Sequence, residues 1–400
     1  MNRFSMTDAT TPNPDIYLGI MTGTSLDAID VAACRFTGKH RSRGVQLLGF
    51  HSTPWPTHMC EILMDLATSS MVSMDVLTRS HFLLAKYYAD AVQETLAATG
   101  LGPKDIRAIG LHGQTVRHLP DLHSMEGLPP VRATLQLGSG SALAAISGVD
   151  VVSDFRSADV ALGGQGAPLV PMFDYEFLTS ETVDRMVVNI GGIANVTWLP
   201  HNAKPENVVA FDCGPGNMLL DAVTRKYFGE AFDRDGDRAR QGSVDNMLLA
   251  KLLSHPYFQK QPPKSTGREL FGASFLTSIH KSIEDGVLSP SDALSTLTEF
   301  TARSIVGSID LVNAHSNNIE IILSGGGAYN SYLHERIKRN AFSANVLCSD
   351  ILGIPASAKE AIAFAFFAKA FLEEIPIHLP HTTGAIRSAK LGSLSRGSQQ

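Results

Sequence analysis

The chain has 400 residues, of which 44% are hydrophobic and 18% are charged. This composition is that of a globular protein and excludes a disordered chain, and the length favours two domains over one. The formal net charge of -6 provides no general attraction to nucleic acid or to an anionic membrane, so we expect neither as a partner.

The cysteines and the apolar segments indicate the cellular compartment of the protein. Cysteine occurs at four scattered positions: Cys34, Cys60, Cys213 and Cys348. This spacing suits neither a disulfide framework nor a paired metal site and is typical of reduced thiols. The first 15 residues lack the apolar run of a signal peptide, and the longest helical apolar run, residues 361–368, is too short to cross a bilayer. We therefore expect a soluble, cytoplasmic protein.

The first part of the chain predicts a hairpin followed by a helix and a strand. Apolar, β-favouring residues at 17–21 and 28–36 flank a polar turn at 22–27, which is the pattern of two paired strands. Helical periodicity follows at 76–98, and a further strand is expected at 106–111.

Strands and helices also alternate in the rest of the chain. Strands are expected at 148–153, 185–190, 193–199, 208–212 and 319–323, and helices from 218, from 290 and over 358–374. The strand–glycine turn–strand unit at 17–36 therefore recurs at 185–199. This repeat predicts two related α/β domains that face each other across a cleft. We expect one domain to comprise residues 1–148 with 378–400, and the other residues 149–377.

Three glycine turns follow directly after predicted strands. Gly23-Thr24-Ser25 offers close backbone approach, N–H donors and two hydroxyls to phosphate oxygens. The carboxylates of Asp27 and Asp30 come next, and a carboxylate beside a phosphate site often reaches Mg²⁺. A simple hairpin turn, with Asp27 bonded to its own backbone, is the alternative.

The other two turns are Gly191-Gly192 and Gly325-Gly326-Gly327. Glycines at the carboxyl end of a buried strand remove side chains where a ligand enters an α/β crevice. For residues 325–327 the alternative is a tight strand-to-helix turn, but such a turn seldom needs three glycines. The three glycine turns together favour a nucleotide cleft.

Asp212 ends a predicted strand and precedes Gly-Pro-Gly, so the sheet would fix the position of its carboxylate. Such a position suits a general base. The alternative is a cap for the helix that follows.

Two further groups of polar residues are candidates for binding a polar sugar. Asp154, Arg156, Asp159 and Gln165 surround a glycine-rich loop, in which the arginine could bind a carboxylate; a solvated Asp–Arg pair is the alternative. His112 and Gln114 follow the strand at 106–111 and are either sugar ligands or a hydrogen-bonded pair in the core.

Several longer motifs are similar to those of the anhydro-N-acetylmuramic acid kinases. The matching segments occur in the order of the family and comprise residues 19–30, 111–118, 154–156, 163–168, 189–195, 211–217, 263–269 and 324–330.

The resemblance implies two RNase H-like domains of the actin/hexokinase/Hsp70 type, with mixed sheets, flanking helices and a central nucleotide cleft. It implies an ATP- and Mg²⁺-dependent kinase that opens the 1,6-anhydro ring of anhydro-N-acetylmuramic acid with water and phosphorylates O6, in peptidoglycan recycling. ATP and this sugar would be its small-molecule partners; a homodimer is left open.

The resemblance also carries residue roles. The loop that would hold the ATP phosphates comprises Gly23, Thr24, Ser25, Leu26, Asp27, Ala28, Ile29 and Asp30. Asp212 would be the general base, and Glu360 corresponds to an active-site carboxylate of the family. Asp27 is the candidate Mg²⁺ ligand. The family commonly has Ser at Thr22 and Gly at Ala28, and both replacements are small.

Two other functions remain as alternatives. One is a kinase of the same fold for another sugar. The other is a nucleotide-gated chaperone or filament protein, which would need a peptide-binding module or polymer contacts.

Overall fold

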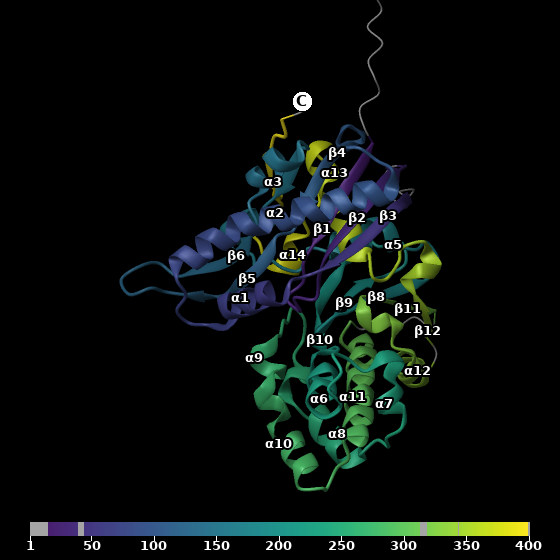
Figure 1. Cartoon of the computed structure of the whole chain (residues 1–400). Helices are drawn as coiled ribbons and strands as arrows, with labels where there is room; N and C mark the ends of the chain where they lie inside the picture. Colours follow the sequence, from purple (N-terminus) through teal and green to yellow (C-terminus); the bar gives the residue numbers. More distant parts are fainter. Residues whose placement is uncertain (1–14, 39–43, 313–317, 343, 399–400) are drawn as a thin grey trace, which may run out of the picture.

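The computed structural model describes residues 15–38, 44–312, 318–342 and 344–398. Two large β-sheets, one above the other in Figure 1, form the framework of the molecule. The strands of the first sheet are β1 (Ile16–Met21), β2 (Ala28–Thr37), β3 (Gly44–Pro54), β4 (Ile106–Leu111), β7 (Val151–Ser153) and β13 (Ser393–Ser395). Those of the second are β8 (Asp184–Ile190), β9 (Ile193–Leu199), β10 (Val209–Pro215), β11 (Ile319–Ser324) and β12 (Asn345–Cys348).

The two sheets share one strand order. The first runs β3-β2-β1-β4-β7 and the second β10-β9-β8-β11-β12, with β13 added at the edge of the first. In each, the first three strands form an antiparallel meander and the last two pair in parallel. The repeat seen in the sequence is thus a repeat of topology, and the expected α/β fold of two RNase H-like units is confirmed.

Helix α13 (Lys359–Leu372) packs across β1, β2 and β4 at van der Waals distance. A Cβ atom on Gly19 of β1 would lie 1.8 Å from the carbonyl oxygen of Ala361, and one on Gly110 of β4 would lie 1.9 Å from that of Phe364. Glycine is therefore required at both strand positions for the helix to approach.

The apolar run 361–368 lies in this helix, which is buried on all sides. Its far side meets α5 (Pro171–Leu178): the ring of Phe366 lies 5.0 Å from that of Phe177 and 5.7 Å from that of Phe36 on β2. One hydrophobic core therefore continues from the first sheet through α13 and α5 to residues of the second sheet such as Val187 and Ile322. A helix that is apolar all round is expected in such a position.

The remaining elements cover the outer faces (Figure 1). On the first sheet these are α1 (Thr57–Thr68), α2 (Met74–Thr99), α3 (Gly140–Ser147), α4 (Ser157–Ala161) and the projecting hairpin of β5 (Gln114–His123) and β6 (Val131–Leu137). On the second they are α6 (Met218–Phe228), α7 (Asp237–Arg240), α8 (Asn246–Leu253), α9 (Arg268–Phe271), α10 (Ala273–Glu284), α11 (Pro290–Leu311) and α12 (Ser331–Asn340). The short helix α14 (Pro380–Thr383) contacts β10 of the second sheet. Within the described ranges, none of these helices is long and apolar enough to cross a bilayer.

The predicted elements correspond closely to the observed ones, with two exceptions. The strand expected at 148–153 is only β7, residues 151–153, and the strand expected to end at Asp212 continues as β10 to Pro215. The sequence patterns did not predict β3, the β5–β6 hairpin, β12 or β13. The expected division of the chain at 148/149 stays a prediction; β7, just beyond it, pairs with β4, and α13 packs on the first sheet.

Candidate functional site

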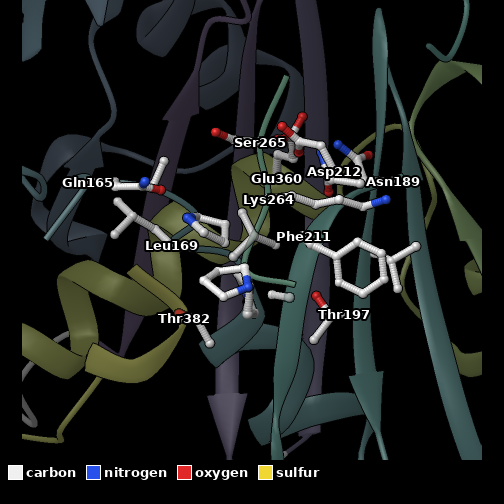
Figure 2. A pocket seen from close by; sticks show the side chains of 18 of the residues that line it. Gln165, Leu169, Asn189, Thr197, Phe211, Asp212, Lys264, Ser265, Glu360 and Thr382 are labelled. Atoms are coloured by element: carbon white, nitrogen blue, oxygen red, sulfur yellow. The ribbon is translucent and has the colours of Figure 1, made fainter. Parts of the chain in front are cut away.

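A cavity of about 210 Å³ lies between the two sheets and is lined from both sides. Met21 at the end of β1 and Glu360 on α13 line it from the first sheet; Asn189 on β8, Thr197 on β9 and Asp212 on β10 line it from the second. Figure 2 shows Glu360 and Asp212 close to each other in the view, with Gln165 on the opposite side of the pocket. The structure thus gathers residues that are up to 361 positions apart, from Met21 to Thr382, around one space.

The Asp212 carboxylate is oriented by a neighbouring loop. Its Oδ2 accepts a hydrogen bond of 2.9 Å from the backbone N–H of Thr266. Its own N–H donates to the carbonyl of Lys264 at 3.1 Å, and its carbonyl accepts from the Tyr257 hydroxyl at 2.6 Å. A backbone donor to a carboxylate is a charge-assisted bond, so the loop holds Asp212 in one orientation toward the cavity.

Glu360 stands in the first turn of α13, where burial raises the pKa of its carboxyl group. Lys359 and Arg156 oppose this rise in the pKa, whereas Asp30 adds to it. Glu360 therefore holds its proton to a higher pH than an exposed glutamate does.

A buried ion pair fixes the start of α13. The Lys359 Nζ lies 2.8 Å from Oδ1 of Asp174 on α5, and the two side chains are only 1% and 2% exposed. The Thr197 hydroxyl donates to the other Asp174 oxygen at 2.8 Å. Because α5 packs on the second sheet, this pair ties the residue beside Glu360 to that sheet.

The predicted sugar ligands fall into two groups. Arg156 and Gln165 line the cavity. Arg156 also donates to His112 Nε2 at 2.7 Å and to the Gly166 carbonyl at 2.6 Å. Burial lowers the pKa of Arg156 to about 10, so it stays charged at neutral pH. Burial, with Arg156 nearby, holds the pKa of His112 well below its usual range, so this ring is neutral and can accept that bond.

The others lie away from the cavity lining. Gln114 Nε2 donates to the Gly23 carbonyl at 3.2 Å and so braces the β1–β2 turn. Asp154 is exposed and accepts from the Ser157 hydroxyl and N–H at the start of α4. Asp159 is completely buried beneath the 163–166 loop.

The predicted phosphate loop is the turn of the β1–β2 hairpin together with the start of β2. Thr24, Ser25 and Asp27 are exposed, whereas Leu26 is buried at a φ of 62°. Ala28, Ile29 and Asp30 belong to β2, where the Ser52 hydroxyl donates to Asp30 at 2.6 Å. The exposed part of the turn is the part that can offer donors to a ligand.

One carboxylate of this turn interacts electrostatically with the beginning of α6. Burial raises the pKa of Asp221, in the first turn of α6, to about 7; Arg225 opposes the rise and the charge of Asp27 contributes to it. The charge of Asp27 thus acts on the amino-terminal end of α6, and the free backbone N–H groups of a helix amino terminus favour anions.

The glycine turns of the second sheet meet at one edge. The N–H groups of Gly216 and Asn217 donate to the carbonyls of Gly192 and Gly191 at 2.9 and 2.8 Å. Beside them, a Cβ on Gly325 would lie 2.6 Å from Oδ1 of Asn189.

Glycine occurs at the three positions 325–327 for different structural reasons. Gly325 has a φ of 76°, and a Cβ on Gly327 would lie 2.3 Å from Cγ2 of Ile190, so both serve the packing of the turn. A Cβ on Gly326 would meet no atom within 4 Å, so this glycine leaves open space.

Sequence reasoning assigned no role to Lys264 or Thr266, although their segment, 263–269, matched a family motif. Both lie in a loop without periodicity, and only the fold brings them to Asp212. The Lys264 Nζ donates to the Tyr257 carbonyl at 3.2 Å and lies 4.6 Å from the centre of that ring. Asn189 and Thr197 were also missed, because polar residues inside strands gave no separate signal.

The metal expectation rests on Asp27 alone. Across the residues that the structure describes, no group of three or more His, Cys, Asp or Glu side chains is arranged to hold a metal ion. A ligand set for Mg²⁺ would have to include phosphate oxygens.

The comparisons with known proteins address the family directly. The model of the family described as anhydro-N-acetylmuramic acid kinase matches residues 15–397. The chain belongs to this family. An anhydro-N-acetylmuramic acid kinase of Shewanella amazonensis is 40% identical over 379 residues, covering 94% of this chain and 98% of the relative. One of Saccharophagus degradans is 42% identical over 381 residues, covering 95% and 99%.

The chain is less similar to solved structures than to the anhydro-N-acetylmuramic acid kinases described above. The activator of the 2-hydroxyisocaproyl-CoA dehydratase from Clostridium difficile with bound ADPNP covers 90% of this chain and 96% of its own, with 13% identity and a TM-score of 0.45. A TM-score this low supports no argument about function.

Proposed function

We propose that the protein uses ATP to phosphorylate O6 of 1,6-anhydro-N-acetylmuramic acid while water opens the anhydro ring, giving N-acetylmuramic acid 6-phosphate. The observation that carries the proposal is the cavity between the sheets, lined by Asp212 from one side and Glu360 from the other. The names of the relatives supply the sugar.

Asp212 is the proposed general base. It takes a proton from the water whose oxygen bonds to C1 as the C1–O6 bond breaks. The electron pair of that bond stays on O6, which attacks the γ-phosphorus, and ADP leaves. The Thr266 N–H keeps the carboxylate aimed, since a base must be held within hydrogen-bonding reach of the proton that it removes.

Glu360, Arg156 and Gln165 are the proposed sugar-binding side chains. Burial raises the pKa of Glu360, which favours the protonated carboxyl group that can donate a hydrogen bond to a sugar oxygen. Arg156 already donates to His112 and Gly166, so we assign it an electrostatic attraction to the lactyl carboxylate instead of a two-pronged grip.

The exposed β1–β2 turn and the glycine turns at 191–192 and 325–327 are the proposed phosphate and nucleotide contacts. The open space at Gly326 and the exposure of Asp27 fit a nucleotide with its magnesium ion. When bound, Mg²⁺ neutralises charge on the phosphates, and Asp27 is the side chain that would hold it or its water. We place the enzyme in the cytoplasm, with ATP and the sugar as its partners, and leave homodimer formation open.

The test is a product assay in ¹⁸O-labelled water. We expect one ¹⁸O atom in the hydroxyl at C1 and none in the phosphate or at O6. Unlabelled product added to the same water for the same time measures the slow exchange of the anomeric oxygen. A phosphosugar that keeps its anhydro ring, or phosphorylation of other sugars but not of this one, would favour the alternative kinase.

A further inference from the structure

The loop that carries Gln165 into the cavity has little regular structure of its own. It runs from Gly163 to Pro168, and both Gly163 and Gly166 have positive φ values, of 82° and 77°. Gln165, Ala167 and Pro168 line the cavity. Glycines make such a loop adaptable, so something else must define its position.

The side chain of Asp159 lies directly under this loop and is fully buried. Its Oδ2 accepts the Gly166 N–H at 2.6 Å. Its Oδ1 accepts from the Thr383 hydroxyl and from Nε2 of His378, both at 2.5 Å. A Cβ on Gly164 would lie 2.2 Å from the carboxylate, so the loop backbone rests on it.

Two of the three donors to Asp159, His378 and Thr383, come from the carboxyl-terminal segment, more than 200 residues away. The Ala389 N–H donates to Nδ1 of His378 at 2.9 Å, so Nε2 carries the hydrogen that faces Asp159. The same segment holds the loop backbone, because the Gln165 N–H donates to the Thr383 carbonyl at 2.9 Å. The loop is thus held between Asp159 and residues 378–389.

None of the contacts of Asp159 described above reaches the cavity. Its two oxygens accept three donors from within the protein, and a side chain with no exposed surface cannot meet a sugar. This arrangement differs from the sugar-binding role expected from the sequence.

We propose that Asp159, with His378 and Thr383, positions the 163–168 loop so that Gln165 faces the sugar. These three residues are positioning residues that affect sugar binding and leave nucleotide binding unchanged. The inference takes the identity of the sugar from the proposed function. The contacts that hold the loop do not depend on that function.

Two substitutions and one control test the proposal. Asp159→Asn replaces a carboxylate oxygen by an amide NH₂ that must face a donor, and Thr383→Val removes one hydroxyl at nearly constant volume. Thr298→Val is the control: this threonine is also buried, and its hydroxyl donates to the Leu294 carbonyl at 2.8 Å within α11.

The first measurement is amide hydrogen exchange in the ligand-free protein. We expect the amides of Gly164, Gln165 and Gly166 to exchange roughly tenfold faster in both test variants and at the wild-type rate in Thr298→Val. Unchanged exchange in Asp159→Asn would overturn the hold on the loop, whether or not the enzyme accepts the anhydro sugar.

The second measurement is steady-state kinetics with each substrate. We expect the KM for the anhydro sugar to rise roughly tenfold in both test variants while the KM for ATP stays within about twofold. Faster loop exchange with unchanged sugar KM, or an equal rise for ATP, would show a purely structural role. A wild-type enzyme inactive on this sugar would refute the proposed function and leave the exchange result to decide on the loop.

Discussion

At the scale of single residues, Asp212 is the side chain on which the proposed chemistry depends most directly. In Asp212→Asn the amide oxygen can still accept the Thr266 N–H, so the fold and nucleotide affinity should be preserved. Loss of the base should lower kcat by roughly 10² to 10⁴. Stopped assays of phosphosugar formation, with ATP affinity from calorimetry, give both quantities.

A matched control is Asp90→Asn, an exposed aspartate on α2, which should keep wild-type kcat. If Asp212→Asn also kept wild-type kcat, another group would have to accept the proton from water.

Asp221 makes stability depend on pH. Its pKa in the folded protein is raised to about 7, mainly by burial, so the folded state binds more protons than the unfolded state between about pH 4 and pH 7. The free energy of unfolding therefore falls as pH rises through this window.

We expect Asp221→Asn to remove this fall. Relative to wild type, the variant should gain on the order of 1–2 kcal/mol between pH 5 and pH 8, a value reduced for partial solvent screening. Urea unfolding at pH 5 and pH 8 measures the free energy of unfolding of both proteins. The same difference between variant and wild type at both pH values would show that the pKa of Asp221 is not raised.

At the scale of elements, the contact between α13 and the first sheet depends on two glycines. In Gly110→Ala the new methyl would overlap the Phe364 carbonyl, so the helix or the strand must move. We expect a loss of about 3 kcal/mol of stability. Activity should fall as well, since Glu360 is carried by the same helix.

Gly307→Ala on α11 is the matched control. Its Cβ would meet no atom within 4 Å, and alanine favours a helix by about 0.5–1 kcal/mol over glycine, so this variant should be slightly more stable than wild type. Urea unfolding of both variants makes the comparison. Gly110→Ala with wild-type stability would contradict the close approach.

Elements and turns could be predicted from the sequence because they depend on local patterns. The hydrophobic strands and the glycines after them located the turns at Gly191 and Gly325. Asp212 was expected at a strand end, but it lies inside β10, which continues to Pro215 past an irregularity between Asp212 and Gly214. The hold on Asp159 could not be predicted, since its partners His378 and Thr383 are 219 and 224 residues away. Lys359 was missed for the same reason: an ion pair with Asp174 depends on packing between elements.

The sequence also could not show why glycine is needed at a given position. Gly325 and Gly327 make room for β8, whereas a Cβ on Gly326 would meet no atom within 4 Å, yet the three are adjacent and identical. Gly19, within the segment that resembles a nucleotide loop, serves the packing of α13. Only the neighbouring atoms distinguish these cases.

At the scale of the whole molecule, the proposed site is divided between two sheets. The β1–β2 turn and Glu360 belong with the first sheet, and Asp212 and the glycine turns with the second. Binding of both substrates should therefore draw the sheets together, as in other two-lobed kinases. Small-angle scattering should show a smaller radius of gyration with the sugar and a non-hydrolysable ATP analogue than with neither; an unchanged value would argue for a site already closed.

The buried pair of Lys359 and Asp174 limits what form such a movement can take. Separating two charges that are almost without exposed surface would cost several kcal/mol, so this contact should persist in every state of the enzyme. The lobes would then rotate about this contact. Glu360, next to Lys359 in the chain, would move little, whereas the tip of the β1–β2 turn would move much more. We therefore expect the sugar-binding side of the site to move little during closure and the nucleotide-binding side to move most.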